Sequence, residues 1–273
     1  MEHDFLLLRY GEIFLKGKNR GLFERKLVDN VKKITGKKST KLRGRLLMEY
    51  FSEHSSLKRV FGLVSYSPAI KVDGSLEEIE KAALNVLSGK KGTFRIQTKR
   101  SDKRFPLTSP EINQRIGSFI EKHTSLSFSL KNSDIILYIE INQEGIYLFT
   151  EVISCFGGLP TGIGGKVFLL LEDESSLLAG LLMMKRGTSI IPIAYGEKDI
   201  SLLQKYSPVD LELKIIKNLN EFDENISILV SGQNFEKYEE YETNLLVLRP
   251  LISMDANDIN LSLGGLISEK YAG

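Results

Sequence analysis

Residues 157–176 read GGLPTGIGGKVFLLLEDESS, and this stretch divides the chain into two differently built halves. Gly157–Gly165 holds five glycines and one proline, a composition typical of a loop between folded segments. Val167–Leu171 is an uninterrupted apolar run, as expected for a strand that is buried on both faces. Three acidic residues and two serines follow it directly.

The glycine-rich stretch does not fit a phosphate-binding P-loop. Pro160 stands where the first glycine of that motif should be, and Val167 replaces the Ser or Thr expected after Lys166. We therefore interpret Gly157–Gly165 as a hinge or domain linker.

Beyond the linker, apolar strands alternate with helical stretches. A helix is predicted around Leu177–Met184, and further strands at Ser189–Ala194 and Ile226–Val230, with another candidate at Leu246–Leu248. Strand–helix alternation with continuous apolar strands indicates a parallel α/β sheet.

Before the linker, strands and helices alternate and end in a hairpin. Strands are predicted at Phe5–Tyr10, Leu46–Tyr50, Val64–Val72 and Thr93–Thr98, and a hairpin pairs Ile135–Ile141 with Ile146–Val152. Pro68 implies that the third of these strands is an edge strand or is broken. This half therefore resembles two small α+β units.

Capping residues and apolar spacing predict the helices of this half. Asn19 precedes a helix whose apolar face comprises Phe23, Leu27, Val31 and Ile34. Ser75 and Glu78 form a capping box for a second helix. Ser109 is the expected N-cap of a third, with Pro110 in its first turn.

Composition excludes several classes of protein. No stretch approaches the roughly 18 apolar residues of a membrane-spanning helix, so we expect no membrane association. The single cysteine, Cys155, excludes an intramolecular disulfide and favours a cytoplasmic location. The three histidines lie far apart in the sequence, and therefore we expect no metal site.

Charge is distributed unevenly between the two halves. Residues 1–165 contain 27 basic and 18 acidic residues, a net charge of +9, and residues 166–273 contain 10 and 17, a net charge of −7, which together give the total of +2. A basic half suggests a polyanionic partner such as a nucleic acid, although a solubilising surface is the alternative.

Two basic clusters stand out within the first half. The first surrounds the loop before the first helix and includes Lys16, Lys18 and Arg20. The second follows a predicted strand and leads to a helix N-terminus; it comprises Arg95, Lys99, Arg100, Lys103 and Arg104. A basic loop that leads to a helix N-terminus is suited to phosphate groups or an RNA end.

Three stretches together resemble the tRNA 4-thiouridine synthetases (tRNA sulfurtransferases). RYGEIFLKGKNR at 9–20 is similar to the family's N-terminal ferredoxin-like domain, and KRSDK with FPLTSPEI at 99–112 is similar to its THUMP domain. GGLPTG at 157–162, followed by GKV at 165–167 and the apolar strand, resembles the entry to its PP-loop domain.

The resemblance implies an α+β fold followed by an α/β fold. It implies a ferredoxin-like domain at residues 1–62, a THUMP domain at 63–156 and a PP-loop domain at 165–273. The last is an adenine nucleotide hydrolase-like, Rossmann-like domain, and we expect it to be degenerate here.

The resemblance also implies a substrate. Such THUMP domains grip the acceptor stem and 3′ CCA end of tRNA, and full members of the family use ATP and Mg to convert uridine 8 to 4-thiouridine. The residues that carry over as tRNA contacts are Arg95, Lys99, Arg100, Lys103 and Arg104, with Lys16, Lys18 and Arg20 as weaker candidates.

The chain departs from the family where the nucleotide should bind. The family's Ser-Gly-Gly-x-Asp-Ser loop is replaced by Glu172, Asp173, Glu174, Ser175 and Ser176, and the loop is one residue shorter. Pyrophosphate binding needs glycines and a free helix N-terminus, whereas carboxylates repel phosphate and suit a helix cap. No cysteine follows the linker, and Cys155 is expected to be a packed thiol. We therefore expect neither a cofactor nor a catalytic residue.

These observations predict a tRNA-binding protein of this family without thiolation activity of its own. Its acidic domain would suit a basic protein partner, and a homodimer remains an open expectation. The alternatives are an active tRNA sulfurtransferase with an unconventional loop, and a structural or regulatory module that has also lost RNA binding.

Overall fold

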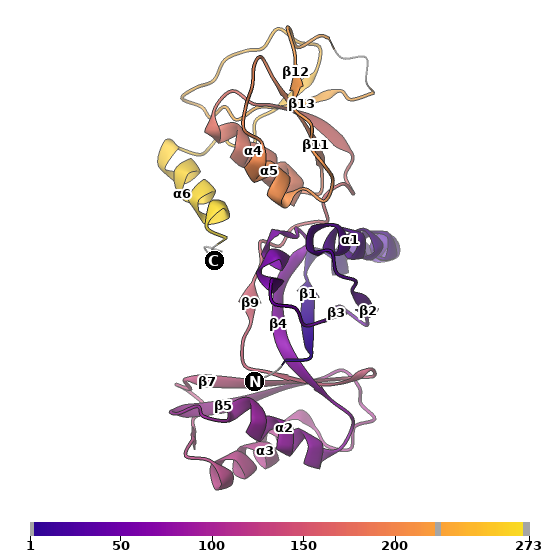
Figure 1. Ribbon diagram of the computed structural model, residues 1–273, viewed down its shortest axis with the longest axis vertical. Coiled ribbons are helices and arrows are strands. Elements are labelled where there is room, and N and C mark those ends of the chain that lie inside the picture. Colours follow the sequence, from indigo (N-terminus) through magenta and orange to yellow (C-terminus); the bar gives the residue numbers. More distant parts are fainter. Residues whose placement is uncertain (1–2, 222–224, 270–273) are drawn as a thin grey trace. The chain divides into compact units, whose positions relative to one another are not determined.

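The computed structural model describes residues 3–221 and 225–269, which form two compact units (Figure 1). The first unit comprises the chain up to Leu8, Lys41–Ser52 and Tyr66–Ile153, and the second comprises Arg9–Thr40, Glu53–Ser65 and the chain from Ser154 onward. The domain limits drawn from the sequence, at 1–62, 63–156 and 165–273, stay a prediction.

The strands before residue 155 join one mixed sheet. Its order is β2-β3-β1-β4-β8-β7-β5-β6, and β9 also pairs with β4. The bounds are β1 Phe5–Tyr10, β2 Thr40–Leu42, β3 Arg45–Glu49, β4 Leu63–Val72, β5 Thr93–Arg100, β6 Ser127–Phe128, β7 Ile135–Asn142, β8 Gly145–Phe149 and β9 Ile153–Ser154. The predicted hairpin is confirmed, because β7 and β8 pair antiparallel and Asn142 lies opposite Gly145.

Pro68 does not have the effect that the sequence suggested. β4 runs unbroken through it and lies inside the sheet, so the prediction of an edge or a break was wrong. β8 pairs with β4 only at Ile70–Val72, while Cys155 N donates to Val64 O at 2.8 Å. Pro68 therefore lies in the gap on this side of β4, between the residues that pair with β8 and the residue that bonds to Cys155. No hydrogen bond is needed there, so the missing N–H of Pro68 costs little.

Helices α2 (Leu76–Leu87) and α3 (Ser109–His123) cover one face of β5 and β7, and their shared core is apolar (Figure 1). Ser75 caps α2 as predicted: its Oγ accepts from Glu78 N at 3.2 Å. The N-cap of α3 is Thr108 and not Ser109, because the Glu111 carboxylate accepts from both N and Oγ1 of Thr108 at 2.7 Å.

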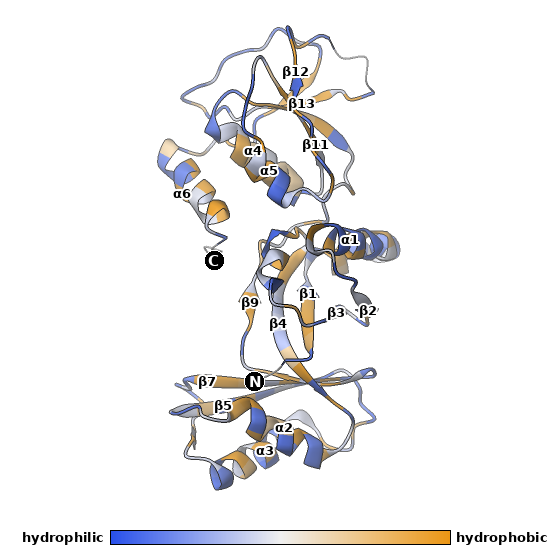
Figure 2. Ribbon diagram, viewed as in Figure 1, coloured by the Kyte–Doolittle hydropathy of each residue, from blue (hydrophilic) through white to orange (hydrophobic). Residues whose placement is uncertain are grey.

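The helices near the N-terminus belong to the second unit. They are the 3-10 helices η1 (Glu12–Asn19) and η2 (His54–Arg59) and the α-helix α1 (Arg20–Thr35). Leu27 and Val31 are fully buried, whereas the rest of α1 is largely hydrophilic (Figure 2). The predicted amphipathic helix is therefore confirmed.

The glycine-rich stretch, interpreted from the sequence as a hinge or domain linker, is a hydrogen-bonded loop within the second unit, and its role as a linker stays a prediction. Leu159 N donates to Lys185 O at 2.9 Å, and both Gly162 N and Gly164 N donate to Gly187 O. Asn30 of α1 adds a buried hydrogen bond from Nδ2 to Thr161 O at 3.0 Å. Glycine is required at 158, where φ is 81° and a Cβ would lie 2.2 Å from Lys185 O.

After this loop the chain builds the predicted parallel sheet, in the order β12-β11-β10-β13-β14. The strands are β10 Lys166–Leu170, β11 Ser189–Ala194, β12 Lys214–Ile215, β13 Ile228–Val230 and β14 Leu246–Leu248; the helices are α4 Glu174–Lys185, α5 Ser201–Tyr206 and α6 Ala256–Ile267. The strand order reverses between β10 and β13. In open α/β sheets ligands bind beyond the carboxyl ends of the strands at such a point.

Candidate functional site

The basic residues of β5 are divided between its two faces. Phe94 and Ile96 are buried against the helices, so strand alternation places Arg95 and Lys99 on the opposite face. Lys99 is exposed and lies in register with Glu140, which pairs with Arg45 at 3.1 Å. Nε of Arg95 is buried and has no hydrogen-bond partner among the described residues.

The loop from Ser101 to Leu107, which we call the basic loop, connects β5 to α3. Ser101 N donates to Ile141 O at 2.8 Å, which ties the start of the loop to the end of β7. Nη1 of Arg100 donates to the carbonyl oxygens of both Phe105 and Leu107, each at 2.8 Å. The backbone of the loop is therefore held at several points.

Two basic side chains of this loop point outward. Lys103 is exposed, and Arg104 is 75% exposed although it pairs with Asp102 at 2.7 Å. Hydrogen bonds from Arg104 lower the pKa of Asp102 to about 2. The structure thus brings Lys103 and Arg104 together on one loop, while Arg100 faces the loop's own backbone.

The weaker candidates on η1 and α1 are partly engaged. Arg20 Nε donates to Glu24 at 2.7 Å, and its guanidinium lies 4.5 Å from the Phe14 ring centroid. Tyr10 Oη donates to the same carboxylate, and burial together with Glu24 raises the pKa of Tyr10 to about 12. Lys16 lies over the Phe23 ring, whereas Lys18 is exposed.

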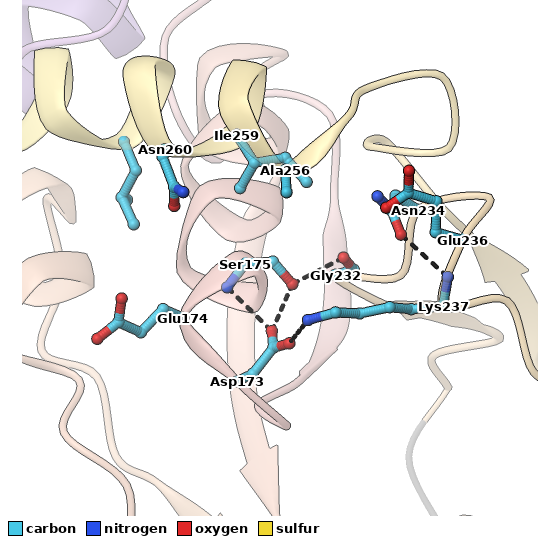
Figure 3. Close-up of a pocket in the computed structure, with 11 residues that line it drawn as sticks. Asp173, Glu174, Ser175, Gly232, Asn234, Glu236, Lys237, Ala256, Ile259 and Asn260 are labelled. Atoms are coloured by element: carbon cyan, nitrogen blue, oxygen red, sulfur yellow. Dashed lines mark hydrogen bonds and ion pairs between the residues drawn. The ribbon is translucent and has the colours of Figure 1, made fainter.

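The segment Glu172–Ser176, which we call the acidic loop, begins α4. Asp173 is the N-cap: its Oδ1 accepts from Ser175 N at 2.9 Å and also from Ser175 Oγ (Figure 3). Its other oxygen accepts from Lys237 Nζ at 2.9 Å. Burial alone would raise the pKa of Asp173, but the hydrogen bonds from Ser175 and Lys237 outweigh it and lower the pKa.

The chain's own groups bridge the carboxyl ends of β10 and β13. Tyr241 Oη donates to Glu172 Oε2 at 2.6 Å and lies 2.8 Å from Ser231 Oγ. Ser175 Oγ also lies 2.8 Å from Gly232 O, which shares the single hydroxyl hydrogen with Asp173 Oδ1. A Cβ on Gly232 would lie 2.5 Å from Ser176 N, so the backbone after β13 packs directly on the first turn of α4.

Arg249 holds the segment that supplies these groups. Its guanidinium lies 4.6 Å from the ring centroid of Tyr238 and 5.5 Å from that of Tyr241. Its Nε donates to Gln233 Oε1 at 3.0 Å and its Nη2 to Glu239 O at 2.8 Å. No role was predicted for residues 231–242, because the continuation Glu236–Glu242 is acidic. Its hydrogen bonds to the acidic loop join residues 57 to 69 positions apart in the chain.

A hollow of about 320 Å³ borders the acidic loop. Carboxylates of Asp173, Glu174 and Glu236 line it together with apolar side chains of α6, Ile259 and Leu263 (Figure 3). Lys237 is its one cation among the described residues. This lining repels an anion.

Cys155 is a buried thiol, as expected. It is 2% exposed, and burial raises its pKa to about 12. A thiol with such a pKa is a poor nucleophile at neutral pH.

No helix within residues 3–221 and 225–269 is both long and apolar enough to cross a membrane. In the same residues, no group of three or more His, Cys, Asp or Glu side chains could hold a metal ion.

Comparison with known proteins first defines the class. Residues 5–67 match the ThiI ferredoxin-like domain, and residues 74–151 match the THUMP domain, so the basic loop lies inside the THUMP match. The protein is therefore a THUMP-domain protein with an N-terminal ferredoxin-like domain and a C-terminal α/β domain.

The relatives then define the family. A probable tRNA sulfurtransferase of Mycoplasmopsis agalactiae is 33% identical over 278 residues, which cover 99% of this chain and 70% of that protein. One of Mycoplasmopsis synoviae is 34% identical over 88% of this chain and 66% of its own length, and one of Brevibacillus brevis is 39% identical over 71% and 52%. The chain belongs to the tRNA sulfurtransferase family, and it spans about half to two thirds of the length of most of these relatives.

Solved structures agree over nearly the whole chain. PH1313 from Pyrococcus horikoshii superposes with a TM-score of 0.84 at 30% identity, covering 96% of this chain and 99% of that one. A 4-thiouridine synthetase in complex with RNA and ATP superposes with a TM-score of 0.85 at 26% identity, covering 98% and 86%.

Proposed function

We propose that this protein binds tRNA and that its basic loop contacts the acceptor stem and 3′ CCA end. The observation that carries the proposal is the exposure of Lys103 and Arg104 on a loop whose backbone is fixed, with exposed Lys99 two residues before it in the sequence. Phosphate neutralisation requires such cations, and a fixed loop loses little freedom on binding. A relative of the same fold in complex with RNA supports the choice of ligand.

We further propose that the protein does not carry out ATP-dependent thiolation by itself. A pyrophosphate bound as in a PP-loop needs free N–H groups at the start of α4, and here Ser175 N donates to the Asp173 side chain and Ser176 N donates to Asp173 O. Three carboxylates around the adjoining hollow would also repel a nucleotide. These residues do not fit ATP, and the buried Cys155 does not suit sulfur transfer.

A silent α/β domain can still act as a docking surface. The net charge of −7 beyond residue 165 supports a basic protein partner for this domain, and such a partner would supply catalysis in trans. We propose that the protein acts in the cytoplasm, where its tRNA would be found. We also propose that two copies of the chain can form a homodimer.

Affinity for tRNA tests the first proposal. We would measure binding to intact tRNA and to the same tRNA without its CCA end, from 50 to 200 mM salt. Tight binding that weakens with trimming and with salt is expected. Equal or negligible binding to both RNAs contradicts the proposal and leaves a protein partner as the main hypothesis.

Nucleotide binding tests the second proposal. Calorimetry with ATP and Mg is expected to show no saturable binding. Saturable binding that is lost in Lys166→Ala or Ser175→Ala would instead support an active tRNA sulfurtransferase with an unconventional loop. Leu261→Ala, at an exposed position on α6, serves as the control variant.

A further inference from the structure

We infer that Arg100 is a positioning residue, which fixes the basic loop for RNA and does not itself bind phosphate. The inference rests on the proposed tRNA binding and extends it, because it assigns different tasks to two residues that the sequence treats alike. Arg100 holds the loop, and Lys103 makes the contact.

The first observation is the geometry at the guanidinium. One nitrogen, Nη1, carries two hydrogens, and the two carbonyl oxygens that it contacts, those of Phe105 and Leu107, both lie at 2.8 Å. These carbonyls are two residues apart on a loop without regular structure, so no strand or helix partner satisfies them. The arginine replaces the backbone hydrogen bonds that a strand would have provided.

The second observation is that the ends of the loop are fixed by other means. Ser101 N and Oγ both donate to Ile141 O, and Thr108 donates twice to the Glu111 carboxylate. Between these points the side-chain hydrogen bonds that hold the loop within the described residues are those of Arg100 to the two carbonyls and those between Arg104 and Asp102. Phe105 and Leu107 also pack against the apolar core that includes Phe94 and Ile96 of β5. Without Arg100, residues 103–107 would keep this packing but lose their hydrogen bonds to β5.

The third observation concerns charge. Hydrogen bonds from Arg104 lower the pKa of Asp102, and hydrogen bonds from Thr108 lower the pKa of Glu111. The charge of Arg100 makes a further contribution that lowers the pKa of both carboxyl groups. Both carboxylates therefore lie within electrostatic range of this guanidinium. Lys103 is exposed at the turn, where a phosphate can approach.

A double-mutant cycle on tRNA binding separates the two tasks. Arg100→Met is expected to weaken tRNA binding about tenfold, and Lys103→Met in that background should cost less than about twofold more, because residues that act through one another are not additive. Lys99→Met is the matched control: it lies on the other face of β5, and its cost should be the same in both backgrounds.

Amide hydrogen exchange tests the order of the loop without RNA. Arg100→Met should speed exchange at residues 102–107, while β7 and α2 stay protected and so report that the variant is folded. Should this variant not fold, Arg100→Lys keeps the charge but lacks the planar fork, and faster exchange in the same residues is again expected.

The outcomes are distinct. Equal costs of Lys103→Met in both backgrounds, or unchanged exchange in the loop, would overturn the role of Arg100. If the unaltered protein fails to bind tRNA, the proposed function fails instead, and the exchange experiment still tests whether Arg100 orders the loop.

Discussion

The basic loop and the acidic loop occupy equivalent places in two different sheets, since each leads from the carboxyl end of a strand into the first turn of a helix. In the basic loop, apart from the Arg104–Asp102 pair, the contacts are made to backbone atoms, as when Arg100 binds two carbonyls, and the cation of Lys103 stays exposed. In the acidic loop the charged side chains themselves are used, as when Asp173 caps α4 and binds Lys237. A loop fixed through its backbone keeps its charges for a ligand, whereas a loop fixed through its side chains does not.

The largest expected effect is on tRNA binding, and it tests the comparison at the basic loop. Lys103→Glu with Arg104→Glu should weaken tRNA binding on the order of 100-fold and reduce the salt slope by about 2, because two phosphate contacts become repulsive. Filter binding across salt concentrations measures both. Glu174→Gln with Glu236→Gln, in the acidic region, is the control and should leave tRNA affinity unchanged; an equal effect of both pairs would contradict the comparison.

The next effect concerns the packing of Gly232 on α4. Gly232→Ala should destabilise the fold by about 1–3 kcal/mol, because the new Cβ would meet the backbone of Ser176 and cannot be accommodated by rotating a side chain. Urea unfolding measures this change. Gly264→Ala is the control, since nothing lies within 4 Å of its Cβ position inside α6, and it should stabilise by about 0.5–1 kcal/mol.

A smaller effect is expected at the bridge between β10 and β13. Tyr241→Phe removes the hydroxyl that joins Glu172 to Ser231 and should cost about 1 kcal/mol in the free energy of unfolding. Tyr238→Phe keeps the ring under Arg249, and its hydroxyl makes no hydrogen bond within the described residues, so it should be neutral. Equal stability of the two variants would show that the bridge does not hold the two strand ends together.

The smallest effect is a pH dependence at the acidic loop. The pKa of Asp173 in the folded protein lies below its ordinary value of 3.8, so its charge stabilises the fold above that pH and the contribution is lost as pH falls through the lower folded value. Asp173→Asn keeps a good N-cap but removes the charge. Unfolding free energies at pH 7, 5, 4 and 3 should show the wild type above the variant at pH 7 and the gap closing at pH 3; a gap that widens there would reverse the assignment.

Local signals in the sequence were sufficient for most of the fold. The alternation in 93–98 and the pairing of Ser75 with Glu78 each predicted an element that the structure contains. The carboxylates at 172–174 also indicated a helix cap, and Asp173 fills that role. The one-residue error at Ser109 arose because Thr108 and Ser109 are both good caps, and only the reach of Glu111 separates them.

The sequence by itself determined the class of each element and the sign of the charge near each loop, because periodicity and capping depend on residues fewer than five positions apart. The tertiary structure alone decided which charges stay exposed. Tyr241 meets Glu172, and Gly232 covers Ser176, only because β10 and β13 are neighbours in the sheet. Arg100 likewise differs from Lys103 in its contacts only because the loop folds back and brings the carbonyl oxygens of Phe105 and Leu107 to its guanidinium. Pairings over such distances depend on strand order and chain path, which no local pattern encodes.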